Sequence, residues 1–267
     1  MASNPPINLK PWASEPFRSV VAYLRETAAF ADAVTFGLAN TGKIALAEEL
    51  FQELDRLLTT DPMAVSPQRA DILKDLRERA KHAEEQVRSG LPLLYSQFAV
   101  GTWSVLEAAI DDFVIAWLVN VPQAITSEDF AKIKVSIAVY EQLDPTSRMQ
   151  LLLEEYKRNL RSELKIGVER FESLLKPLGL IGPLADDVRR DILELSQVRN
   201  VILHRSGRVD QKLLSGCPWL NLKPGEKLAV TQQDSDRYVH ACTEYLKQII
   251  SRVKASAEAV SEVAGAI

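Results

Sequence analysis

The segment 199–204 contains three side chains that can act on a phosphate group, namely Arg199, Asn200 and His204. A guanidinium binds phosphate oxygens through charge-assisted hydrogen bonds, an amide donates a further hydrogen bond, and an imidazole takes up and releases protons near neutral pH. Asn200 and His204 are four residues apart, so on a helix they share one face and converge on one point. The spacing predicts a phosphodiester-binding site on the last turns of a helix.

Arg199 also lies on an apolar arc of that helix. At about 100° per residue, the arc comprises Leu184, Val188, Ile192, Leu195, Val198, Ile202 and Leu203. A second apolar arc, in residues 91–119, contains Glu107 in its middle and Asp111 at its edge. A charge on an apolar face is costly unless it is paired, so we expect Glu107 and Arg199 to form an ion pair between helices. A pair that only fixes helix register, with His204 as a helix-terminal histidine, accounts for the same pattern.

The composition is typical of a globular protein. Of 267 residues, 46% are hydrophobic and 25% charged, and no apolar run is long enough for a transmembrane helix. The first residues lack the pattern of a signal peptide, so we expect a cytoplasmic protein with no membrane association. Cys217 and Cys242 form no metal-ligand spacing and no disulfide framework, which predicts free thiols. Because no metal or cofactor motif is present, none is expected.

The net charge of −4 excludes the general basic field of proteins that coat nucleic acid, so any RNA contact must be local. Segment 188–212 reverses this balance. It contains Arg189, Arg190, Arg199, Arg205, Arg208 and Lys212 against Asp191, Glu194 and Asp210. This is either a positive patch around the 199–204 segment or an ordinary solvated helix face.

The elements that must position these residues are all helical. After an extended lead of sixteen residues, hydrophobic periodicity predicts two helices in 17–58 separated by "NTGK", and further helices in 67–88, 91–119, 127–142, 144–165, 168–176, 184–204 and 232–259. Asp144 or Thr146 is the expected cap of one helix, and Thr231 with Asp234 forms a capping signature for the last. "GEKLAV" is compatible with a short strand, but one strand makes no sheet. We therefore predict an all-α protein with an amino-terminal helical region, 1–88, and a helical bundle domain, 89–267.

The sequence around the arginine resembles a known motif. "QVRNVILHRSGRVD", residues 197–210, is similar to the Arg-polar-spacer-His motif of the HEPN superfamily. "GTWSVLEAAIDDFVIAW" resembles the earlier helix of that superfamily with its embedded acidic residue, and "LKPLGL" is similar to the RiboL-PSP branch. The resemblance covers roughly residues 90–255 and leaves the first 88 unexplained.

This resemblance implies an up-and-down helical bundle that dimerises with its two motif helices facing each other. Active members of the superfamily are metal-independent endoribonucleases, often toxins or defence effectors, so RNA, a second copy of the chain and an antitoxin or regulatory protein are the expected partners. By the resemblance, Arg199 would hold the scissile phosphate, Asn200 would bind a phosphate oxygen and His204 would act as general acid or base.

The supporting residues follow from the same resemblance. Glu107 would orient the arginine with help from Asp111, and Arg205 and Arg208 would contact RNA. The alternative is a non-catalytic nucleotide-binding or protein-interaction module built on the same bundle. Trp219, in the loop after the motif, either stacks on a base or anchors that loop to the bundle.

Overall fold

The computed structural model describes residues 9–58, 67–160 and 166–256 of the chain. All named elements in these ranges are α-helices or short 3-10 helices, which confirms the all-α prediction. Within "GEKLAV", Lys227 forms an isolated bridge with Arg208, and the segment forms no strand.

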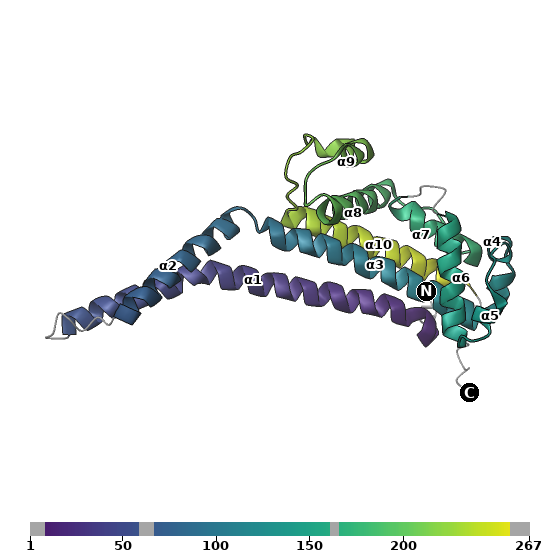
Figure 1. The fold of residues 1–267 in the computed structure, drawn as a ribbon, viewed down its shortest axis with the longest axis horizontal. Coiled ribbons are helices and arrows are strands. Elements are labelled where there is room, and N and C mark those ends of the chain that lie inside the picture. Colours follow the sequence, from purple (N-terminus) through teal and green to yellow (C-terminus); the bar gives the residue numbers. More distant parts are fainter. Residues whose placement is uncertain (1–8, 59–66, 161–165, 257–267) are drawn as a thin grey trace, which may run out of the picture.

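The bundle is built around α3 (Pro92–Asn120) (Figure 1). Four long helices contact it: α1 (Pro11–Leu58), α6 (Pro145–Leu160), α8 (Asp186–His204) and α10 (Gln232–Ala255). Helix α3 is apolar over most of its circumference, and its buried side chains include Trp103, Leu106, Ile110, Phe113 and Trp117. A helix that is hydrophobic nearly all round must be covered on several sides, which places α3 at the centre.

Shorter elements connect the long helices. They are η1 (Pro122–Thr126), α4 (Glu128–Ala131), α5 (Ile137–Tyr140), α7 (Val168–Leu175), η3 (Lys176–Leu178), α9 (Gln211–Gly216) and η4 (Pro218–Leu220). The single helix predicted for 127–142 is wrong, because only α4 and α5 form there. Ile133 and Val135, between them, pack against the core from a non-helical segment, and β-branched residues favour such extended backbone.

Helix α1 is continuous, and the break predicted at "NTGK" is wrong. The polar residues of this segment turn back into the helix. Asn40 Nδ2 donates to the carbonyl oxygen of Phe36 at 2.7 Å, and Thr41 Oγ1 donates to that of Gly37 at 3.0 Å. The helix also begins at Pro11 instead of after an extended lead of sixteen residues, since Ala13 and Phe17 are buried in the core.

Helix α1 belongs to the bundle over its first part and leaves it over the rest. Ala13, Phe17 and Val20 lie in the same core as α3, whereas the later turns pair with α2 (Pro67–Arg88). The two helices form an arm that extends beyond the bundle (Figure 1). The region 1–88 therefore contains both a piece of the bundle core and this arm.

The predicted caps are partly confirmed. Asp144 Oδ1 accepts hydrogen bonds from the backbone of Thr146 and Ser147 at the start of α6, so Asp144 is the cap of that helix. Thr231 and Asp234 form the expected capping box at the start of α10. These side chains satisfy backbone N–H groups that the first helical turn leaves unpaired.

Both cysteines are free, as expected, and the structure buries both of them fully. Burial raises the pKa of Cys217 and of Cys242 to about 12. A thiol with that pKa is deprotonated in only about one molecule in 10⁴ at pH 8, and the thiolate is the reactive form. We predict that neither thiol reacts with dithionitrobenzoate in the native protein and that both react in guanidinium chloride. A Ser89→Cys variant, with an exposed thiol, is the positive control; rapid labelling of the native wild type contradicts the prediction.

Candidate functional site

The Arg-Asn-His segment occupies the last turns of α8. Arg199 and Asn200 are partly buried, and His204, the last residue of the helix, is exposed. The chain then reverses, because the amide of Gly207 donates to the carbonyl oxygen of Val201 and both Ser206 and Gly207 have positive φ. This left-handed cap ends α8 at His204 and leaves the imidazole at the surface.

Arg199 and Asn200 contact each other directly. Arg199 Nη1 donates to Asn200 Oδ1 at 3.2 Å, so the amide nitrogen of Asn200 keeps its donors for another partner. Within the described residues, Nε of Arg199 is a buried donor without a hydrogen-bond partner. His204 lies one turn after Asn200 on the same helix face. The structure therefore brings Arg199 and Asn200 together and places His204 next to them.

Glu107 does not pair with Arg199, and that expectation is wrong. Its carboxylate forms an ion pair with Arg170 of α7, at 2.5 Å from Nη2. Helix α7 packs against α3, so a cation on α7 meets the carboxylate. Periodicity correctly placed Glu107 on a largely buried helix, but it gave no information about which neighbouring helix faces it.

Asp111 is paired elsewhere as well. It accepts a hydrogen bond from Lys157 of α6 and lines a pocket of about 550 Å³ between α3 and α6. Burial raises the pKa of Asp111, and the nearby Lys157 opposes that effect. These contacts connect Asp111 with α6 and not with Arg199, Asn200 or His204.

Arg205 and Arg208, expected to contact RNA, are both exposed beside the end of α8. Arg205 Nε lies 3.3 Å from Asp210 Oδ2, and Arg208 Nη1 donates to the carbonyl oxygen of Gly225 at 3.3 Å. Asp210 also caps α9 by accepting from the amide of Leu213. Each arginine thus helps to hold the turn and keeps further donors toward solvent.

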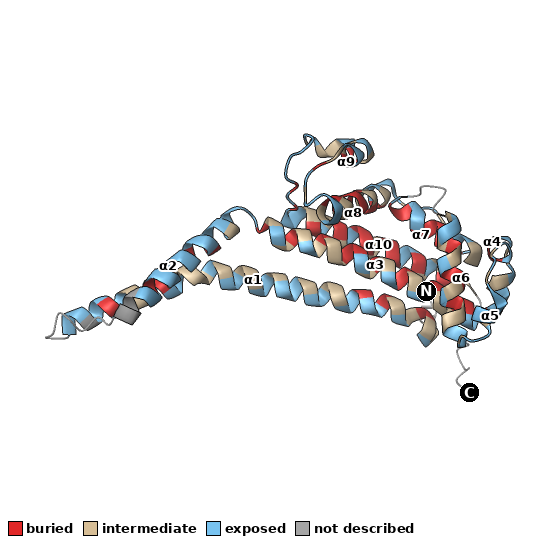
Figure 2. Ribbon diagram, viewed as in Figure 1, coloured by how far each residue is buried: buried red, intermediate tan, exposed pale blue. Residues whose placement is uncertain are grey.

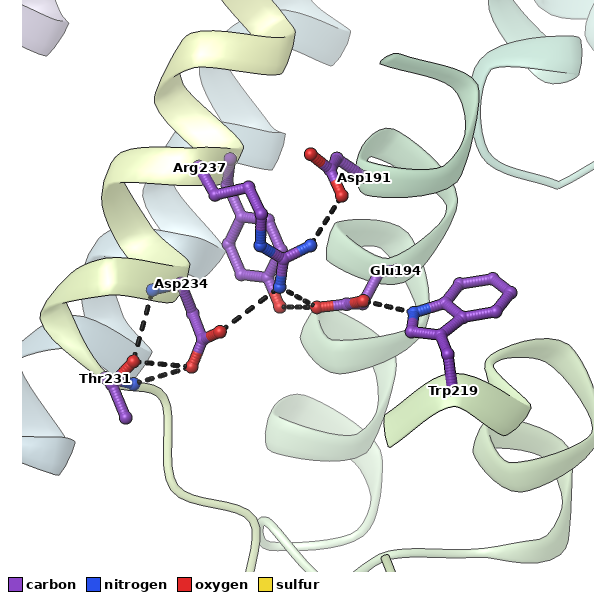
Figure 3. A network of polar contacts seen from close by, with 7 residues as sticks. Asp191, Glu194, Trp219, Thr231, Asp234 and Arg237 are labelled. Atoms are coloured by element: carbon purple, nitrogen blue, oxygen red, sulfur yellow. Dashed lines mark hydrogen bonds and ion pairs between the residues drawn. The ribbon is translucent and has the colours of Figure 1, made fainter. Parts of the chain in front are cut away.

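The most buried charge on α8 is Glu194. No role was predicted for it beyond its charge in the 188–212 segment. Its side chain is 1% exposed. Figure 3 shows that it accepts hydrogen bonds from Trp219 Nε1, Arg237 Nη2 and the hydroxyl of Tyr238. Arg237 also binds Asp191 at 2.5 Å, and Asp234 at 3.1 Å. The network joins α8, η4 and α10.

The pKa values of two groups in this network, Tyr238 and Arg237, are raised by their surroundings. Burial, together with the adjacent Glu194 carboxylate, raises the pKa of Tyr238, so its hydroxyl remains a neutral donor. Burial by itself lowers the pKa of Arg237, but hydrogen bonds to Glu194 and Asp191 more than offset it and raise the value overall. Both groups therefore keep their protons at physiological pH and act as hydrogen-bond donors to Glu194.

Trp219 anchors the loop that follows the motif, which was one of the two roles predicted for it. In addition to its bond to Glu194, its ring lies under the guanidinium of Arg190, 4.7 Å from the ring centroid. These residues line a pocket of about 610 Å³, in which Asp191 and Glu194 are already paired with Arg237. In the sequence, only the spacing of Asp191 and Glu194 points weakly to this network, because residues three apart lie on one helix face.

No protein-family model matches the chain, and no curated protein or solved structure is significantly similar to it. The likeness to the HEPN superfamily therefore rests on the motif residues alone. Across the described ranges, no helix has the length and apolar character needed to cross a membrane. Those ranges also contain no group of three or more His, Cys, Asp or Glu side chains that could hold a metal ion.

Proposed function

We propose that this chain is a metal-independent endoribonuclease of the HEPN type, acting at the end of α8. The observation that carries the proposal is the Arg199–Asn200 contact one turn before an exposed His204. An arginine with spare donors, an amide nitrogen and an imidazole within the last turns of one helix are the groups that phosphodiester cleavage by an internal nucleophile requires. Exposed Arg205 and Arg208 beside them suit the flanking phosphates.

In this proposal, Arg199 and the amide nitrogen of Asn200 bind the non-bridging oxygens of the scissile phosphate. The ribose 2′-oxygen attacks phosphorus and loses its proton to a base, while the bond from phosphorus to the 5′-oxygen breaks and that oxygen gains a proton. The products are a 2′,3′-cyclic phosphate and a 5′-hydroxyl. His204 is the group on this surface that can move either proton.

One histidine per chain supplies one of the two proton transfers. The resemblance to the superfamily implies a dimer in which two motif helices face each other, so His204 of the second copy can make the other transfer. We therefore place the complete site between two copies of the chain. The two free, buried thiols suit a reducing cytoplasm. Control of such an enzyme by an antitoxin or another regulatory protein is part of the same proposal.

A non-catalytic nucleotide-binding module is the second candidate, and the Glu107–Arg170 ion pair favours it. Without a carboxylate to orient it, Arg199 serves equally well to hold the phosphate of a bound nucleotide. In that case, the protein binds mononucleotides or RNA but leaves them intact.

Incubating the purified protein with a mixed RNA pool in EDTA distinguishes the endoribonuclease from the non-catalytic nucleotide-binding module. If the chain is an endoribonuclease, we expect fragments with 2′,3′-cyclic phosphate and 5′-hydroxyl ends, which mass spectrometry identifies. Intact RNA together with saturable nucleotide binding by calorimetry supports the module. Intact RNA and no binding of RNA or nucleotide rejects both candidates.

A further inference from the structure

The arm is built asymmetrically, and α2 is its solvent-adapted half. Leu73, Ala80 and Ala83 are buried against α1. Apart from Ile72 and Val87, the exposed residues between 71 and 88 are polar or charged, including Lys74, Asp75, Arg77, Glu78, Arg79, Lys81, Glu84 and Glu85. A helix with one apolar seam and a charged remainder needs no further partner.

Helix α1 has the opposite arrangement over the length of the arm. The side toward α2 is small or polar: Ala45 and Gln52 are buried there, and Glu49 forms an ion pair with Arg77 of α2 at 2.7 Å. Leu54 is nine residues from Ala45, which at 3.6 residues per turn places it about 180° away. The face of α1 that points away from α2 is therefore the apolar one, and its large side chains are exposed. In Figure 2, α1 is coloured exposed or intermediate over most of its length.

We call this face the arm stripe. It consists of Phe36, Ile44, Leu50, Phe51, Leu54, Leu57 and Leu58, each between 50% and 76% exposed. Fully exposed side chains of this size present roughly 150–250 Å², so the stripe leaves roughly 700 Å² of apolar surface in water. A standard interface buries about 800 Å² per partner, and contiguous exposed apolar patches of this size mark interaction sites.

Four residues of the stripe, Ile44, Phe51, Leu54 and Leu58, have the spacing of a coiled-coil seam, and the other three fall at the flanking g position. Ile44, Phe51 and Leu58 repeat every seven residues, as a positions do, and Ala47 and Leu54 occupy the d positions between them. Lys43 and Glu48 then fall at a g position and at the following e position. In a parallel pair, the g residue of one helix faces the e residue of the other, so Lys43 meets Glu48 of the partner subunit with opposite charge.

We propose that a second copy of this chain covers the arm stripe, the two α1 arms forming a parallel, in-register coiled coil. The apolar area matches what a dimer needs, the seven-residue repeat fits a helix as the occupant, and the Lys43–Glu48 pairing makes the surface complementary to itself. A two-fold axis along the arms makes the interface isologous, with the same residues on both sides. The inference stands on α1 alone and does not require the proposed ribonuclease.

Sedimentation velocity of the full chain at micromolar concentrations tests the proposal. We expect the wild type to be a dimer and the double variant Phe51→Gln/Leu54→Gln to raise the dimer Kd by at least about a thousandfold, because four apolar side chains leave the interface. The double variant Ile72→Gln/Ile137→Gln is the matched control: it removes two exposed apolar side chains outside the stripe and should remain dimeric. Circular dichroism checks that both variants keep their helix content.

Single cysteines report the orientation. Ala47→Cys and Leu54→Cys should each form an intermolecular disulfide on mild oxidation, since every d residue faces its own counterpart in a parallel pair, while both native cysteines are buried. A wild type that is monomeric throughout overturns the proposal, as does cross-linking at only one of the two positions. A dimer that survives Phe51→Gln/Leu54→Gln also overturns it, because the contact then lies elsewhere, and that result leaves the ribonuclease proposal untouched.

Discussion

Replacing His204 with alanine is expected to lower the rate of RNA cleavage by about 10²–10⁴-fold, the usual contribution of a general acid or base. The imidazole lies exposed at the end of α8, so its removal should leave the fold and the thermal midpoint unchanged. Single-turnover cleavage in EDTA measures the effect. The chain has two other histidines, His82 and His240, both exposed, and their alanine variants are matched controls that should cleave at the wild-type rate.

Variants of Arg199 separate charge from geometry at the same site. Arg199→Ala should remove cleavage, whereas Arg199→Lys should restore only a small part of it, because an ammonium keeps the charge but lacks the planar fork that binds two phosphate oxygens. If all His204 and Arg199 variants cleave as the wild type does, the activity belongs to a contaminating nuclease and the proposed site is wrong.

Replacing Glu194 with alanine is expected to lower the free energy of unfolding by about 3–5 kcal/mol, the cost of removing one partner from a buried ion pair. Glu194 is the common acceptor for Trp219, Arg237 and Tyr238. Its loss leaves a buried hydroxyl without that acceptor and removes one of the carboxylates that neutralise the guanidinium. Urea unfolding followed by circular dichroism at 222 nm measures the change.

Glu244→Ala is the control for this measurement. Glu244 forms its ion pair with Lys247 on the exposed side of α10, and exposed pairs of this type contribute little to stability, so the urea midpoint should not move. A Glu194→Ala protein that unfolds at the wild-type urea concentration would show that the network of Figure 3 does not hold α8, η4 and α10 together.

Local patterns in the sequence predicted most helices correctly. The predicted ranges for α2, α3, α7 and α10 lie close to the observed bounds. The capping box of Thr231 and Asp234 was predicted, and Asp144 was one of two candidates for the cap of α6. These successes share a cause: a helix face and a cap depend on residues within one or two turns of each other. At "NTGK" the polar residues predicted a helix end that is not there, because Asn40 and Thr41 donate hydrogen bonds to carbonyl oxygens of the preceding turn.

Pairing between helices was not predictable in the same way. Periodicity placed Glu107 on a helix that is largely buried, yet its partner is Arg170, not Arg199. It also gave no reason to bury Glu194, which is covered only because η4 brings Trp219 over that face of α8. The apolar residues of 44–58 were assigned to a helix, but nothing local showed that α2 would pack on the other side.

The amino-acid sequence by itself thus determined an all-helical chain and put Arg199, Asn200 and His204 on the last turns of one helix, because neighbours along a helix are fixed by their spacing. Only the tertiary structure decided which carboxylate meets which cation and which apolar face stays in water. Those outcomes depend on how helices far apart in the chain are placed against one another, and one helix face fits several neighbours almost equally well.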